Sequence, residues 1–152
     1  MVLTKILKAE CIKVPLEGTD KKAVITELVD LLDSQGLLID REVVLDAVLT
    51  REKTRSTGIG SGLAIPHGKC KAVKELVMAI GILPKPIEFD SVDGKGVSIV
   101  VLLASPANQT GPHIQALAQI SRMMLDEQFR QKVQNALSTE ELYELIISKE
   151  NN

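Results

Sequence analysis

The chain has 152 residues and a mass of 16.5 kDa, close to the size of one domain that buries roughly two thirds of its surface on folding. Hydrophobic residues make up 45% and charged residues 25%, which excludes disordered, collagen-like and low-complexity chains. No apolar run approaches the roughly 18 residues of a membrane span, and the first residues lack the long apolar stretch of a signal peptide. We expect one domain over 1–152, cytoplasmic and not membrane-embedded.

The charge balance excludes a polyanion as an obvious partner. Eighteen Lys and Arg against 20 Asp and Glu give a net charge of -2, and the sequence has no Trp and only three other aromatic residues for base stacking. We therefore expect no nucleic acid partner. Two cysteines, Cys11 and Cys70, allow at most one disulfide, which a domain of this size does not need.

The first half of the chain predicts a strand and two helices. A strand is expected over 11–16, where polarity partly alternates. Helical spacing follows Asp20, at Val24, Leu28, Leu31 and Leu32, and Gly36 stands where a left-handed cap belongs. Asp40 predicts the start of a second helix that continues to residues 50–52.

The second half predicts two buried strands and three helices. Residues 76–83 and 97–104 are apolar almost throughout, which is typical of strands buried on both faces, and Asp93-Gly94 is expected to turn between them. A helix opening at Gly111-Pro112 is expected to turn Ile114, Leu117, Ala118, Ser121 and Leu125 inward. Asp126 should begin a helix with Phe129, Val133 and Leu137 on one face, and Ser138 with Glu141 forms a capping box before the last helix. This pattern predicts a layered α/β/α domain.

Between the halves lies a glycine-rich stretch, residues 57–68, that ends in Pro66-His67-Gly68. Pro66 restricts the backbone before the imidazole, and Gly68 leaves room for a close approach to the ring. A histidine with an unperturbed pKa of ~6.5 is largely neutral in the cell and can attack phosphorus through one ring nitrogen. His67 is therefore a candidate phosphoryl acceptor.

Phosphoryl oxygens need donors, and the same stretch supplies candidates. We expect phosphate contacts from backbone amides and hydroxyls at Thr57, Gly58, Gly60 and Ser61. Residues 51–74 contain six Lys or Arg against one Glu in a chain of net charge -2, with Arg51, Arg55 and Lys69 nearest in sequence. This run favours a bound anion if its charges face His67, and is otherwise a solvated surface.

Other interpretations of these residues carry less support. The glycines fit neither G-x-G-x-x-G nor a P-loop, and no Ser-His-Asp elbow is present. A zinc site from His67, Cys70, His113 and Cys11 lacks any paired ligand spacing, so no metal is expected. A lone histidine is more often a hydrogen-bonded polar residue than a catalyst.

Two segments resemble a known family. Residues 51–69 read REKTRSTGIGSGLAIPHGK, and residues 106–114 read PANQTGPHI. Together, and in this order, they resemble the type-2 EIIA domains, the fructose/mannitol class, of the bacterial phosphoenolpyruvate-dependent phosphotransferase system (PTS). Within that family the chain looks most like the stand-alone nitrogen-regulatory branch, the PtsN-like proteins, since no attached membrane or phosphocarrier domain is expected.

The resemblance implies the PTS EIIA type-2 fold, a three-layer α/β/α sandwich with a mixed central β-sheet. It implies that His67 accepts a phosphoryl group from an HPr-like or NPr-like phosphocarrier protein, with Arg51 and His113 beside it. No cofactor is implied, because transfer between histidines depends on positioning and charge. We also expect a shallow pocket whose apolar rim, at Ile59, Leu63 and Ile65, docks the partner.

Three functions remain open on the sequence. The first is a regulatory EIIA whose phosphorylation changes which target proteins it binds. The second is a sugar-transport EIIA for fructose or mannitol that donates to an EIIB. The third is a non-catalytic binding module of the same fold.

Overall fold

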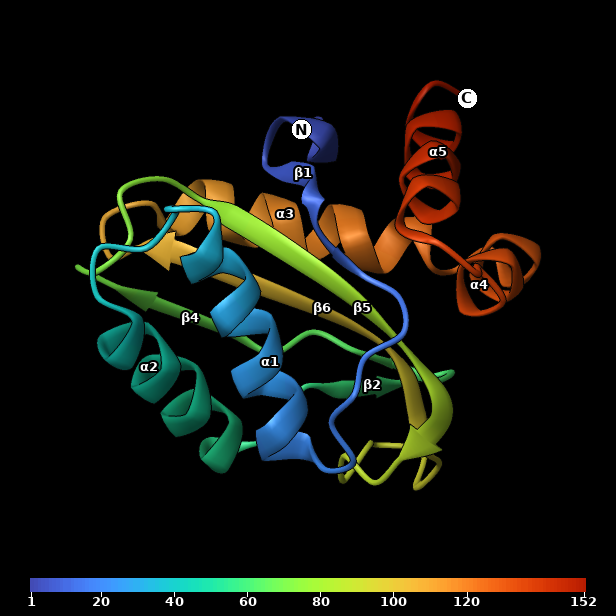
Figure 1. Cartoon of the computed structure of the whole chain (residues 1–152), viewed down its shortest axis with the longest axis horizontal. Helices are drawn as coiled ribbons and strands as arrows, with labels where there is room; N and C mark the ends of the chain where they lie inside the picture. The colour runs from blue at the N-terminus through green and yellow to red at the C-terminus, as the bar shows by residue number, and fades with distance from the viewer.

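The computed structural model describes all residues, 1–152, as helices packed on both faces of a six-stranded sheet (Figure 1). The strands are β1 (Leu7–Lys13), β2 (Gly58–Gly60), β3 (Leu63–Ala64), β4 (His67–Cys70), β5 (Val77–Ile87) and β6 (Val97–Pro106). The helices are a 3-10 turn η1 (Leu3–Lys5), α1 (Lys21–Ser34), α2 (Arg41–Thr54), α3 (Thr110–Met123), α4 (Glu127–Gln134) and α5 (Thr139–Glu150). None of these helices combines the length and apolar character that crossing a membrane requires.

The central strand of the sheet is β6, whose ten residues are all buried. The order is β1-β5-β6-β3-β2, and β4 also pairs with β6. The β5–β6 pair is antiparallel, whereas β3 and β4 run parallel to β6, so the sheet is mixed. Leu63 pairs with Ile99 and His67 with Leu103, so the segment 63–70 follows one edge of β6. His67 therefore lies toward the end of β6 from which α3 departs.

Hydrophobic residues form a core on each face of the sheet. A cluster of 21 buried residues joins η1 and the three C-terminal helices to one face, and a cluster of 20 joins α1 and α2 to the other. Successive residues of β6 alternate between them, since Val101 and Leu103 belong to the first and Val100 and Leu102 to the second. Figure 1 shows α1 and α2 in front of the sheet and α3 behind it. The prediction of a three-layer α/β/α sandwich with a mixed sheet is confirmed.

The predicted helix caps are also present. Asp20 and Asp40 accept hydrogen bonds from the first amides of α1 and α2, and Asp126 and Ser138 do the same for α4 and α5. Gly36 follows α1 with a φ of 70°, the left-handed conformation expected there. These caps fix where α2 begins and so set the register of its last turn, which reaches the site.

Three details of the prediction were wrong. The first strand covers 7–13, because Leu7, Ile12 and Lys13 pair with β5 whereas Pro15 lies beyond the strand. The buried stripe of α3 is His113, Ala116, Ile120 and Met123, while Ile114 and Leu125 are exposed. The buried face of α3 therefore differs from the predicted one, because the side chain of His113 is buried although a polar residue is expected to be exposed. Leu137 is also exposed, because α4 ends at Gln134.

Gly68 sets how closely α2 approaches the sheet. A Cβ built on Gly68 would lie 3.1 Å from the backbone nitrogen of Val48 and 3.2 Å from the carbonyl carbon of Ala47. The backbone of α2 therefore occupies the space that the sequence predicted for an approaching partner. This contact brings Arg51, one turn further along α2, beside β4.

We expect Gly68→Ala to lower the free energy of unfolding by about 1–3 kcal/mol, because α2 must move outward to admit the methyl group. Urea denaturation measures the change. Gly111→Ala is the matched control, since a Cβ there meets nothing within 4 Å and its stability should be unchanged or higher. Equal stability of Gly68→Ala and the original chain would show that this close approach is not a constraint.

Candidate functional site

His67 is the first residue of β4, and its ring is held by the backbone. Its Nδ1 lies 2.7 Å from the carbonyl oxygen of Ile65. Because a carbonyl only accepts, Nδ1 carries the proton and Nε2 of the neutral ring keeps a free lone pair. Burial lowers the pKa of His67 below its ordinary value, an effect opposed by the Ile65 carbonyl and reinforced by the Arg51 charge. The ring of His67 is thus kept neutral, with Nε2 free.

The second histidine, His113, faces His67 from the first turns of α3. The ring centroids are 5.2 Å apart, at an interplanar angle of 62°. His113 is only 4% exposed, and its Nδ1 lies 2.5 Å from the Oγ of Ser105 on β6. Burial, together with the charges of His67 and Lys69, lowers the pKa of His113 to about 4. At neutral pH the site therefore contains two uncharged imidazoles.

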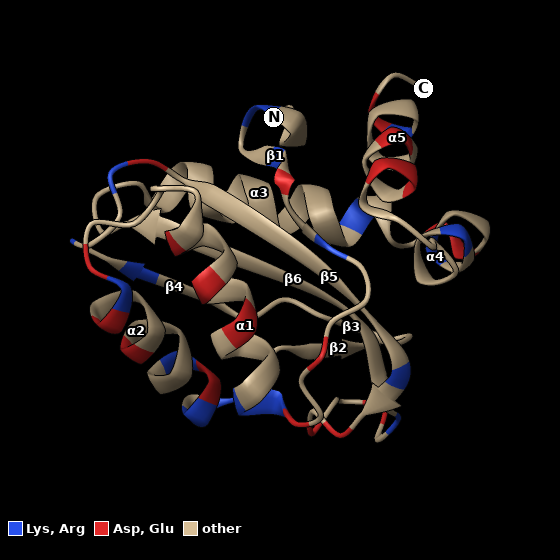
Figure 2. Cartoon of the chain, in the orientation of Figure 1, with Lys and Arg blue, Asp and Glu red and all other residues tan.

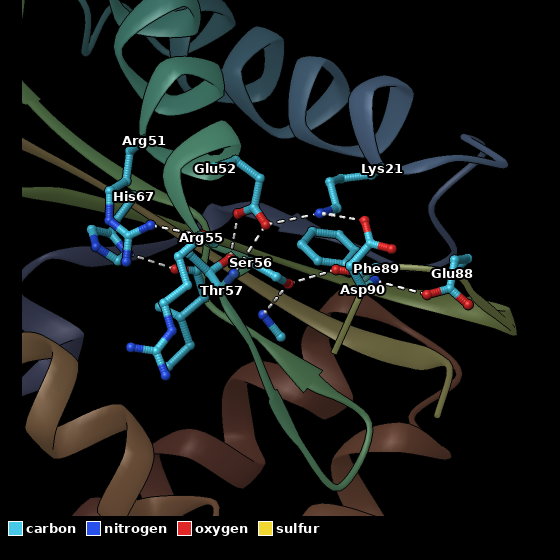
Figure 3. Close-up of polar contacts among 12 residues, drawn as sticks. Lys21, Arg51, Glu52, Arg55, Ser56, Thr57, His67, Glu88, Phe89 and Asp90 are labelled. Atoms are coloured by element: carbon cyan, nitrogen blue, oxygen red, sulfur yellow. Dashed lines mark hydrogen bonds and ion pairs between the residues drawn. The ribbon is translucent and has the colours of Figure 1, made fainter. Parts of the chain in front are cut away.

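Arg51 comes to the site from the last turn of α2. Its Nη1 donates to the carbonyl oxygen of Arg55 at 2.8 Å, which folds the guanidinium back toward His67 (Figure 3). Arg51, His67 and His113 together line an open depression of about 580 Å³ with Lys69. The structure therefore brings the three residues of the predicted catalytic set together.

The local positive charge is less concentrated than the sequence count indicates. Arg51 and Lys69 are the cations that lower the pKa of His67, while Lys53 lines a separate depression with Lys21. Figure 2 shows Asp and Glu segments interspersed with Lys and Arg along α2. The run of six basic residues is thus partly a solvated surface.

The predicted phosphate contacts in the glycine-rich stretch need correction. The Thr57 amide and hydroxyl both donate to Glu52, the Gly58 amide donates to Ser56 Oγ, and the Ser61 amide donates to Asp93. Thr57 and Gly58 do line a depression of about 270 Å³ that includes Arg51 and His67, but Gly60 and Ser61 line neither depression at His67. The stretch forms the short strands β2 and β3 rather than an anion-binding loop, and the amides of Thr57, Gly58 and Ser61 are already paired.

The apolar rim also differs from the prediction. Leu63 and Ile65 are buried in the core, whereas Ile59 is 47% exposed. Val92, which the sequence analysis did not single out, is 67% exposed and lines the same depression as Ile59 and His67. Ile59 and Val92 are therefore the exposed apolar residues of this depression, which Ile65 and the half-buried Leu117 also line.

Sequence reasoning missed two buried polar residues, Glu52 and Ser105. Glu52 is 5% exposed and accepts hydrogen bonds from Thr57. Ser105 is fully buried and holds the His113 ring. The available signals were weak: one glutamate among basic residues, and one serine that ends an apolar strand just before Pro106.

The His113 environment predicts a pH dependence. Its folded pKa of about 4 lies below the unfolded value of ~6.5, so the unfolded chain binds more protons between these values. Stability should therefore fall as the pH drops through this range, with a loss on the order of 3 kcal/mol from this group. NMR titration of the ring should give an apparent pKa near 4. His113→Gln should lose most of this pH-dependent change, and titration near the ordinary histidine value would contradict the assignment.

Comparison of the sequence with known proteins identifies a family and several relatives. Residues 5–149 match the family described as "Phosphoenolpyruvate-dependent sugar phosphotransferase system, EIIA 2". The chain is 36% identical to the nitrogen regulatory protein of Escherichia coli, over 97% of this chain and 91% of that protein. It is 34% identical to the fructose-specific EIIABC component of Bacillus subtilis, over 96% of this chain but only 23% of that longer protein.

A solved structure shares the fold over nearly the whole chain. The nitrogen regulatory protein IIA-Ntr of Neisseria meningitidis superposes with a TM-score of 0.86 at 32% identity, covering 93% of this chain and 97% of that one. The family match, the relatives and the shared fold lead to one conclusion: this chain belongs to the EIIA 2 family of the phosphoenolpyruvate-dependent sugar phosphotransferase system.

Proposed function

We propose that this protein is a phosphoryl carrier that accepts a phosphoryl group on Nε2 of His67 from a phosphohistidine of an HPr-like or NPr-like carrier protein. The observation that carries the proposal is the Nδ1 contact of His67 with the Ile65 carbonyl, beside Arg51 and His113 in one open depression. It leaves a neutral ring with its nucleophilic nitrogen free. No residue of the set requires a metal or an organic cofactor for this step.

The transfer balances without a proton leaving His67. The Nε2 lone pair forms a bond to phosphorus, and the bond between phosphorus and the donor's ring nitrogen breaks, with its electron pair returning to the donor ring. The Nδ1 proton stays on His67 throughout. The Ile65 carbonyl, 2.7 Å away, stabilises the positive charge that develops on the accepting ring.

Arg51 and His113 are the proposed partners of the phosphoryl oxygens. The guanidinium of Arg51 supplies charged donors close to His67. His113 is neutral, so it donates through Nε2 only if its Nδ1 accepts from Ser105, whose hydroxyl lies at 2.5 Å. Ser105 thereby sets the tautomer in which His113 helps hold the transferred group.

The regulatory role is the one we favour. The chain is 36% identical to the Escherichia coli nitrogen regulatory protein, and the IIA-Ntr structure of Neisseria meningitidis superposes on this chain with a TM-score of 0.86 at 32% identity. Two negative charges added at His67 would change its surface strongly and so alter which cytoplasmic target proteins bind. The match to the fructose-specific component supports the alternative, a sugar-transport EIIA that donates to an EIIB.

Phosphorylation of His67 can be measured directly. After incubation with phosphoenolpyruvate, enzyme I and an HPr-type carrier, intact-protein mass spectrometry should show one acid-labile phosphoryl group. His67→Ala should show none, because the nucleophile is lost, while His113→Ala should still accept slowly. A wild-type chain that gains no mass with several active carriers would contradict the proposal and favour a non-catalytic binding module.

A further arm of that measurement separates the two roles. Adding a fructose- or mannitol-type EIIB should leave the phosphoryl group on His67 if the protein is regulatory. Rapid transfer to the EIIB would instead support sugar transport.

The apolar surface made by Ile59 and Val92 is expected to contact the phosphocarrier, because it borders the accepting ring and excludes water. Ile59→Asp or Val92→Asp should weaken carrier binding by about tenfold or more, with little change in thermal stability. A binding titration measures this. Ile39→Asp is the control, since Ile39 is 57% exposed but lies in the connection between α1 and α2. Unchanged affinity in both rim variants would show that the carrier docks elsewhere.

A further inference from the structure

Glu52 is one of six buried polar or charged residues, and both of its carboxylate oxygens are used. Oε2 accepts from the Thr57 amide at 2.9 Å and from Lys21 Nζ at 3.0 Å, and Oε1 accepts from the Thr57 hydroxyl at 2.5 Å. A single side chain of α2 therefore fixes Thr57 through two hydrogen bonds. Figure 3 shows this cluster between α1, α2 and the site.

Hydrogen bonds continue from Thr57 to the accepting ring. The Thr57 carbonyl accepts from the Ile65 amide at 3.1 Å, and the Ile65 carbonyl is the group 2.7 Å from His67 Nδ1. Glu52 thus connects to His67 through Thr57 and Ile65 without touching the ring or lining either depression at His67. The orientation of the Ile65 peptide, and with it the His67 tautomer, depends on where Thr57 is held.

The same turn of α2 places a second part of the site. Arg51, the neighbour of Glu52, donates to the Arg55 carbonyl at 2.8 Å. The last turn of α2 therefore binds the following segment at two points, the Arg55 carbonyl and Thr57. A shift of Thr57 would move both the Ile65 carbonyl, which contacts the His67 ring, and the Arg55 carbonyl, which accepts from Arg51.

This buried carboxylate has a counterion. Lys21, at the start of α1, lies 3.0 Å from Glu52 and 3.4 Å from Asp90, and its ammonium sits 4.9 Å from the centre of the Phe89 ring. A buried carboxylate is costly unless it is paired and hydrogen-bonded, and this one has three donors.

We propose that Glu52 is a positioning residue for phosphoryl acceptance: by holding Thr57 it fixes the Ile65 carbonyl, and so keeps the proton of His67 on Nδ1 and Nε2 free. This inference rests on the proposed function of His67. It assigns Glu52 no contact with the phosphoryl group.

Glu52→Gln tests the proposal, because glutamine has the same size as glutamate. Its NH₂ group replaces one accepting oxygen, so a donor would then face the donors of Thr57 or Lys21. Glu27→Gln is the matched control. Glu27 also accepts from two backbone amides, of Glu17 and Gly18, and from a lysine, Lys13. Its side chain is 13% exposed, against 4% for Glu52, and it holds a loop outside the site.

Two readouts are needed, one of them independent of transfer. The ring ¹⁵N shifts of His67, from ¹H–¹⁵N correlation spectra and assigned with His67→Ala, report which nitrogen carries the proton. The rate of phosphoryl acceptance is measured by mass spectrometry. In Glu52→Gln the Nδ1–H tautomer should no longer dominate, and the rate should fall by about tenfold or more, since small misplacements of a reacting group are costly. Glu27→Gln should lower the melting temperature similarly but keep the tautomer, with a rate within about twofold of wild type.

An unchanged His67 tautomer and rate in Glu52→Gln, or an equal loss of rate in Glu27→Gln, would overturn the proposal. If Glu52→Gln does not fold, Thr57→Val replaces it, because it removes only the hydroxyl that donates to Oε1 and should shift the tautomer in the same direction. If the wild-type chain accepts no phosphoryl group, the proposed function fails, whereas the tautomer measurement still decides whether Glu52 positions His67.

Discussion

The pairing of the segment 67–70 with the end of β6 is the interaction on which the site depends. His67 pairs with Leu103, and the next residues of β6 lead through Ser105 into α3, which carries His113. The two rings come within 5.2 Å because β4 and α3 meet at the same end of one fully buried strand. Gly68, by admitting the backbone of α2, adds Arg51 from the other side. Three elements, β4, α3 and α2, thus meet at the end of β6, and α2 can approach because Gly68 has no side chain.

The charges around His67 act differently before and after transfer. Burial lowers the pKa of His67, and the charges of Arg51 and Lys69 lower it further, so the ring is unprotonated. In the proposed transfer, the same cations would attract the phosphoryl group once it is attached. The Ile65 carbonyl and the Glu52 charge oppose the lowering of this pKa, and the Ile65 carbonyl also fixes the tautomer. One arrangement of charges would therefore favour both the neutral ring and the phosphorylated product of the proposed transfer.

The sequence predicted the layers, the caps and the pairing of His67 with Arg51 and His113, because these follow from short-range periodicity, cap residues and a family resemblance. It did not predict which face of α3 is buried. The prediction placed apolar residues inward, whereas the buried face includes the polar residue His113. Nor did it distinguish Leu63 and Ile65, which are buried, from Ile59, which is exposed. The roles of Glu52 and Ser105 depend on contacts with distant residues or on turns whose geometry a linear pattern does not contain.

The glycine-rich stretch shows why the corrected site suits a carrier better than the predicted one. An anion nest of free amides would add several hydrogen bonds to the phosphoryl oxygens, each worth about 1.5–3 kcal/mol when the acceptor is charged. Such a site would hold the group instead of passing it on. In this fold the amides of Thr57, Gly58 and Ser61 donate to side chains of the protein itself. The donors beside His67 are instead side chains, such as those of Arg51 and Lys69, that line an open depression, so a bond formed at Nε2 in the proposed transfer would stay accessible to the next acceptor.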